Sequence, residues 1–171
     1  MKHLKYFKES LLFHNKEYYT ESIIQIIEDR MLGISDTSKV EVFLSIDRKS
    51  IRQRKKGDII TNKFDILITS IWSKQIFPNG IYTPPFEFGE EMVLDIKSVI
   101  LDLKDVGTTL NHIKVETSWD NKEFESFNQF DRYMMENSIT VTGNEVYEVP
   151  FKVKKLILNF NLPFDIKNDE F

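Results

Sequence analysis

The sequence of 171 residues contains neither cysteine nor alanine, and only 6 glycines and 5 prolines. Without cysteine, disulfides, thiolate chemistry and cysteine-bound zinc are excluded. Alanine is the strongest helix former, so its absence suits a chain that is rich in strands. Isoleucine, asparagine, lysine and phenylalanine are abundant instead, a usage that an AT-rich genome also produces.

Several signatures of chemistry and of membrane targeting are missing as well. No apolar run reaches the roughly 18 residues of a membrane span, so we expect no such span. No apolar core of a secretory signal stands near the N-terminus, so we expect no secretion by that route. Glycine loops for nucleotides and the nucleophile elbow of hydrolases are absent. The histidines lack metal-ligand spacing: His3, His14 and His112. We therefore predict no enzyme, no metal and no cofactor.

The charges are nearly balanced, with a net charge of −4, which argues against general nucleic-acid binding. The exception is Arg48–Lys56, which reads RKSIRQRKK. As a functional site this run would meet an acidic surface on a partner protein. As a structural feature it is a solvated loop between two strands, which we favour. The candidate partner-binding residues are Arg48, Lys49, Arg52, Arg54, Lys55 and Lys56.

The N-terminal part, Met1–Leu32, is predicted to be helical. Thr20 can cap a helix that Gly33 is placed to stop. Apolar residues fall at helical spacing within it: Ile23, Ile24, Ile27 and Met31, after a weaker stripe of Leu4, Phe7, Leu11 and Leu12. Such a stripe either docks on a partner or packs on the chain's own sheet, and we favour the second.

Apolar and polar residues alternate along most of the remaining chain, which is the pattern of half-buried strands. The longest stretch is Glu91–Phe130, in which Asp120-Asn121-Lys122 predicts a hairpin turn. Gly143-Asn144 predicts a second, tight turn. Residues 128–137 fit a short helix or a bulged strand. Further strands are expected at Val40–Ile46, Ile59–Trp72, Ile139–Thr142, Glu145–Val149 and Val153–Leu162.

These short strands predict a mainly β fold, an antiparallel two-sheet β-sandwich of the jelly-roll kind with an N-terminal helical extension. We assign residues 34–171 to the sandwich domain and residues 1–33 to a helical arm, without which the sandwich is expected to be stable. The predicted core consists of inward-facing residues of the strands: Val42, Leu44, Ile66, Ile68, Leu101, Leu103, Ile113, Val115, Leu156 and Leu158.

One passage resembles a known family. Residues 113–127, IKVETSWDNKEFESF, are similar to the strand–turn–strand of discoidin or galactose-binding-like β-sandwiches, and residues 151–161 resemble their return strand. Lys122 stands where those modules usually have glycine, and the terminal cysteines of some members are missing. The resemblance implies a sandwich fold with a sugar as ligand, and no binding residue of the family is carried over, because its binding loops vary.

Trp119, Asp120 and Asn121 are the candidates for a sugar site. Sugars stack on exposed aromatic rings and bond to planar polar groups, but a tryptophan packed in the core beside a hairpin turn is the interpretation we favour.

The combination of a cysteine-free sandwich, a helical arm and this residue usage is similar to tail and baseplate proteins of phages that infect low-GC Gram-positive hosts. The leading prediction is therefore a structural assembly protein of a virion, assembled in the host cytoplasm. Its partners would be other virion or assembly proteins in a homo- or hetero-oligomer, without nucleic acid. The alternative prediction is a carbohydrate-binding module for host surface glycans.

Overall fold

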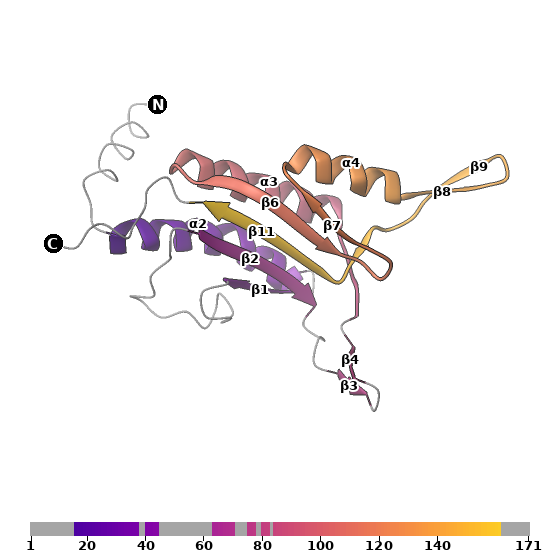
Figure 1. Cartoon of the computed structure of the whole chain (residues 1–171), viewed down its shortest axis with the longest axis horizontal. Coiled ribbons are helices and arrows are strands. Elements are labelled where there is room, and N and C mark those ends of the chain that lie inside the picture. The colour runs from indigo at the N-terminus through magenta and orange to yellow at the C-terminus, as the bar shows by residue number, and fades with distance from the viewer. Residues whose placement is uncertain are drawn as a thin grey trace.

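The computed structural model of the chain describes residues 16–37, 40–44, 63–70, 75–77, 80–82 and 84–161 (Figure 1). The basic run Arg48–Lys56 and the apolar stripe before residue 16 lie outside these residues. In chain order the elements are α2 (Lys16–Thr37), β1 (Val40–Leu44), β2 (Lys63–Ser70), β3 (Gln75–Phe77), β4 (Gly80–Tyr82), β5 (Phe86–Glu87), α3 (Glu90–Asp105), β6 (Thr109–Glu116), β7 (Asn121–Phe124), α4 (Phe127–Asn137), β8 (Ile139–Thr142), β9 (Glu145–Glu148), β10 (Lys152–Val153) and β11 (Lys155–Asn161).

The main sheet has five antiparallel strands in the order β1-β2-β11-β6-β7. Its central strand is the last one in the sequence, β11, which pairs with β2 on one side and β6 on the other. Buried and half-buried residues alternate along β1, β2 and β11, as the period of two predicts. A register shift at Asn159/Phe160 places a β-bulge in the pairing of β11 with β6.

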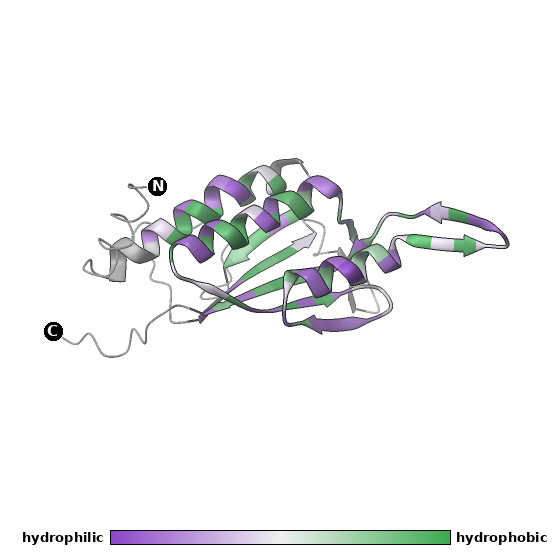
Figure 2. Cartoon of the chain, turned by 90° about the horizontal axis from the view of Figure 1, so that it is seen from above, coloured by the Kyte–Doolittle hydropathy of each residue, from purple (hydrophilic) through white to green (hydrophobic). Residues whose placement is uncertain are grey.

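The helices lie on one face of this sheet. Figures 1 and 2 show α2 and α3 side by side across the strands, and Arg30 of α2 pairs with Asp102 of α3 at 3.1 Å. Ile23, Ile27 and Met31 of α2 are fully buried in the same core as the inward residues of the sheet. The packing of the helices on the sheet, rather than the exposed ion pair, supplies most of the stabilisation.

The prediction of strands between residues 91 and 104 is wrong, because this segment forms helix α3. Its apolar residues fit both the period of two residues of a strand and the period of 3.6 residues of a helix. The alternation of period two is present, but the side chains that the fold buries follow helical spacing: Met92, Val93, Ile96, Val99 and Leu103. Glu90 and Glu91 in the first turn and Lys104 in the last turn also suit the helix dipole. As a consequence Leu101, predicted to lie in the core, is 60% exposed.

The ambiguous segment 128–137 is helical. The side chain of Ser126 caps α4 by accepting a hydrogen bond from the backbone N–H of Gln129 at 3.3 Å, and Gln129 Oε1 accepts one from the N–H of Glu125 at 2.9 Å. Phe130 and Met134 point into the core one turn apart. In α2, by contrast, the expected stop at Gly33 is wrong, since the helix continues to Thr37.

The fold is therefore a mixture of helices and strands built on an antiparallel sheet. The predicted strands at β1, β2, β6, β8, β9 and β11 are confirmed, as is a hairpin of β6 and β7. The predicted position of its turn is wrong, because the turn spans residues 117–120 and Asn121 and Lys122 belong to β7. All predicted core residues except Leu101 are buried. No second sheet faces the main sheet within the described residues, where helices take that place; the other sheets are the pairs β5–β10, β3–β4 and β8–β9. Within the same residues, no helix has the length and apolar character of a membrane span.

Candidate functional site

Exposed apolar side chains gather at one end of the molecule. Of the eight large apolar residues that are exposed among the described ones, six lie around α4, the hairpin β8–β9 and the turn that precedes β7. We call this region the hairpin end and define it by Trp119, Met135, Ile139, Val141, Val146 and Tyr147. The hairpin itself projects beyond the body of the protein, at the right of Figure 1. The remaining two exposed large apolar residues, Leu94 and Leu101, lie on α3.

The hairpin β8–β9 has one apolar and one polar face. Ile139 pairs with Glu148 and Val141 with Val146, and directly paired residues point to the same side. These residues form the apolar face, on which Ile139 is 50% and both valines are 65% exposed. The opposite face carries the pairs Thr140–Tyr147 and Thr142–Glu145. Figure 2 shows the hairpin extending away from the sheet.

The chain around the hairpin has a defined conformation at both ends. At the tip, Gly143 has φ +64°, a left-handed conformation that glycine adopts without strain in a tight turn. At the base, the N–H of Val149 donates to the carbonyl of Ser138 at 2.8 Å, and Ser138 Oγ donates to the carbonyl of Met134 at 2.7 Å. The hairpin is thus a direct continuation of α4.

A hollow lies at the base of the hairpin and continues its apolar face. Its volume is about 490 Å³. Ile139 and Glu148 belong both to the apolar face and to the lining of this hollow, together with Met134, Met135, Ser138, Val149 and Pro150. Most of these side chains are apolar, so the hollow suits a protein surface better than a charged ligand.

The turn before β7 holds Trp119 away from the protein. Thr117 Oγ1 accepts hydrogen bonds from the backbone N–H groups of Trp119 at 3.2 Å and Asp120 at 3.0 Å, and its own N–H donates to the carbonyl of Asp120 at 2.8 Å. Asp120 in turn pairs with Lys122 at 3.2 Å. The side chain of Trp119 is 95% exposed on this turn. The interpretation of Trp119 as a core residue is therefore wrong.

A second hollow, of about 430 Å³, lies beside Trp119. Tyr133 lines it, with its ring held against Phe124 and Phe151 at centroid distances of 5.1 and 5.8 Å. Burial raises the pKa of Tyr133, the charge of Asp120 raises it further and that of Lys122 opposes this. The hydroxyl is therefore neutral at ordinary pH. The polar lining residues are Thr117, Asp120, Asn137 and Lys152.

The three predicted sugar-binding residues do not form one site. Trp119 and Asp120 share the hollow with Tyr133, but Asn121 lines a different hollow of about 310 Å³, together with Lys114, Glu123 and Lys155. Asn121 pairs with Glu116 in the sheet, so its side chain follows the alternation of β7. Sequence reasoning missed Tyr133, Asn137 and Lys152, because only the tertiary fold brings α4 and β10 to the turn.

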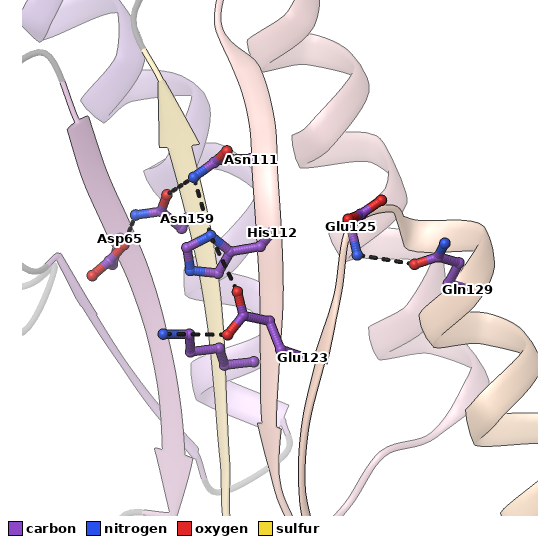
Figure 3. A network of polar contacts seen from close by, with 8 residues as sticks. Asp65, Asn111, His112, Glu123, Glu125, Gln129 and Asn159 are labelled. Carbon is purple, nitrogen blue, oxygen red and sulfur yellow. Dashed lines mark hydrogen bonds and ion pairs between the residues drawn. The ribbon is translucent and has the colours of Figure 1, made fainter.

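The face of the sheet opposite the helices carries a polar network, shown in Figure 3. Asn159 donates to Asp65 and accepts from Asn111 at 3.0 Å, and His112 lies 3.9 Å from Glu123. The network links β2, β11, β6 and β7 through side chains that all have partners. It supports the strand pairing. In the described parts of the chain, no His, Asp and Glu side chains gather in threes as metal ligands do.

The comparisons with known proteins give no match: no protein-family model fits the sequence, and no curated protein and no solved structure is similar to it.

Proposed function

We propose that the protein is a structural assembly protein that joins neighbouring proteins through the hairpin end. The observation that carries this proposal is the apolar face of the hairpin, on which Ile139, Val141 and Val146 are 50 to 65% exposed. A two-stranded hairpin is marginally stable in water unless its apolar face packs on something. Exposed apolar patches on otherwise polar surfaces are typical of protein–protein contacts.

The size of the patch indicates the strength of the contact. Covering the exposed halves of three β-branched side chains contributes about 3 kcal/mol, whereas association itself costs about 4–15 kcal/mol. The hairpin alone therefore supports a weak contact, and Met135, Tyr147 and repeated contacts within an assembly have to add to it. This behaviour fits a component of a multi-subunit structure. A virion tail or baseplate component is the form of this function that the sequence favours, and it stays a prediction.

The proposal is tested with two double variants of equal chemistry. Val141→Ser/Val146→Ser makes the hairpin face polar, and Leu94→Ser/Leu101→Ser makes the same change at the exposed leucines of α3. Light scattering measures association of each variant, alone and co-expressed with the proteins encoded beside it. We expect the hairpin variant to lose association that the wild type and the helix variant retain. Equal behaviour of the two variants would contradict the proposal.

A second candidate function is binding of a sugar in the hollow beside Trp119. The observation that favours it is the exposed indole ring of Trp119 at this hollow. The same hollow is lined by the neutral hydroxyl of Tyr133, the carboxylate of Asp120 and the amide of Asn137. Aromatic rings offer their faces to the C–H groups of a pyranose, and the polar groups bond to its hydroxyls.

Titration of tryptophan fluorescence with mono- and disaccharides tests this second candidate. We expect a saturable response that Trp119→Ala removes and Asn137→Ala weakens. Asn121→Ala is the matched control, since Asn121 lies in the other hollow and its loss is expected to leave the response unchanged. A response that survives Trp119→Ala, or no response to any sugar, would exclude this site.

A further inference from the structure

We propose that the exposed face of helix α3 binds residues 1–15 of the same chain, which pack along it as a further helix. The centre of this face is the leucine stripe, formed by Leu94 and Leu101, which are 58% and 60% exposed. The two residues are seven apart, close to two turns of a helix, so they lie one above the other on α3. The contact is made within one chain and is separate from the hairpin end.

The leucine stripe lies between the two neighbouring helices. On one side of it, Asp102 pairs with Arg30 of α2 at 3.1 Å. On the other side, Lys97 pairs with Asp131 of α4 at 3.4 Å. Within the described residues the stripe itself stays exposed. A helix laid lengthwise on α3 would therefore find apolar side chains beneath it and polar side chains on both flanks.

The topology brings the start of α2 to the end of α3. α2 is joined to β1 by residues 38–39 and α3 to β6 by residues 106–108, so each helix runs opposite to the strand that follows it. β1 and β6 run in opposite directions, because each of the pairings β1–β2, β2–β11 and β11–β6 is antiparallel. α2 and α3 are therefore antiparallel (Figure 1). A segment that turns back before α2 runs along α3 in the same direction as α3.

The apolar spacing of residues 1–15, which lie outside the described part of the chain, matches the leucine stripe. The sequence predicts a helix there, and Leu4 and Leu11 are seven residues apart, as Leu94 and Leu101 are. Packed in the same direction, Leu4 meets Leu94 and Leu11 meets Leu101. Asn15 then stands where the chain must turn into α2, and asparagine tolerates turn conformations.

The charges of the two segments are complementary. Residues 1–15 contain three lysines and one glutamate, whereas α3 contains five acids and two lysines. Glu90 and Glu91 at the start of α3 and Asp105 at its end are exposed. The same register brings Lys2 to the end that holds Glu90 and Glu91, and opposite charges of this kind fix orientation.

The covalent connection decides between this segment and a separate partner. Two leucines offer little apolar surface, and a separate chain that binds them loses translational and rotational freedom. Residues 1–15 are already tethered to α2, so their effective concentration at the stripe is high and most of this loss is avoided. The small area of the stripe therefore suits a contact within the chain.

The absence of cysteine allows a direct test with pairs of introduced thiols. Lys8 follows Leu4 by four residues, as Ser98 follows Leu94, so the proposed register places Lys8 beside Ser98. Full-length Lys8→Cys/Ser98→Cys is oxidised at low protein concentration. We expect a disulfide within one chain, which requires Cα atoms within about 7 Å. The matched control is Lys8→Cys/Glu123→Cys, which is expected to stay reduced, because Glu123 lies on the face of the sheet opposite the helices (Figure 3).

Two results would overturn the inference. Disulfide-linked dimers of Lys8→Cys/Ser98→Cys would show that the segment docks on another chain. Absence of the disulfide, or equal yields from this variant and its control, would show that the segment does not dock on α3. Neither result bears on the association of the hairpin end, which Val141→Ser/Val146→Ser tests.

A second measurement does not depend on disulfide geometry. Maleimide labelling of Ser98→Cys reports how often the stripe is uncovered, and a docked fraction of about nine-tenths slows labelling about tenfold. We expect added Leu4→Ser/Leu11→Ser to restore this tenfold. Tyr6→Ser/Phe13→Ser makes a double change on the opposite side of the predicted helix and is expected to leave the rate unchanged. Equal rates with both double changes would also overturn the inference.

Discussion

Truncation of Leu158 tests the assignment of the faces of the sheet. Leu158 lies on the central strand β11, opposite Ile66 of β2 and Ile113 of β6, and all three side chains are fully buried. Leu158→Ala removes these contacts and leaves a cavity among residues that are fixed by two strand pairings. Such truncations cost about 2–5 kcal/mol. For a chain of this length that corresponds to a melting temperature lower by roughly 5–15 °C.

The neighbouring residue provides the control. Ile157 lies on the same strand but on the opposite face, where it is half-buried between Leu67 and Lys114. Because less apolar surface is lost, Ile157→Ala is expected to cost about 1–2 kcal/mol. Urea unfolding, followed by circular dichroism, gives the loss in free energy of unfolding for each variant. The comparison holds when the free energy falls with urea concentration at the same slope in both variants. Equal losses for the two variants, or a larger loss for Ile157→Ala, would show that the faces are assigned wrongly.

Three further predictions concern other parts of the chain. Deleting residues 1–33 removes the buried Ile23, Ile27 and Met31, so we expect the cooperative melting transition to be lost; a retained transition would show that α2 is dispensable. Replacing Arg52, Arg54, Lys55 and Lys56 by Ser is expected to slow assembly and weaken its salt dependence while the melting temperature stays nearly constant, and an unchanged rate would indicate a solvated loop. Gly143→Ala strains the turn at φ +64° by about 1–2 kcal/mol. Amide exchange in the hairpin should accelerate while that of β11 stays the same.

The strands could be predicted where one face of a segment is buried and the other is not. In β2 and β11 every second residue is apolar, and a period of two has no helical alternative there. In α3 the apolar residues are dense enough to satisfy both periods. Only the presence of α2 beside it, and of the sheet beneath it, decides which residues are buried.

The candidate site could be predicted only in its local parts. The two-residue turn at Gly143-Asn144 fixes the register of the hairpin, so the shared face of Val141 and Val146 was within reach of the sequence. That this face is uncovered by other described residues depends on where the helices lie. The exposure of Trp119 has the same origin, because a strand-end tryptophan is buried or presented according to what packs beside the turn.

Amide hydrogen exchange of residues 139–148, measured at low and high protein concentration, tests the role of the hairpin most directly. If the hairpin end is the contact between neighbouring proteins of an assembly, exchange in β8 and β9 slows as the concentration rises, whereas exchange in β11 does not change. The Val141→Ser/Val146→Ser variant should show no such slowing. Exchange in the hairpin that is the same at both concentrations would contradict the account.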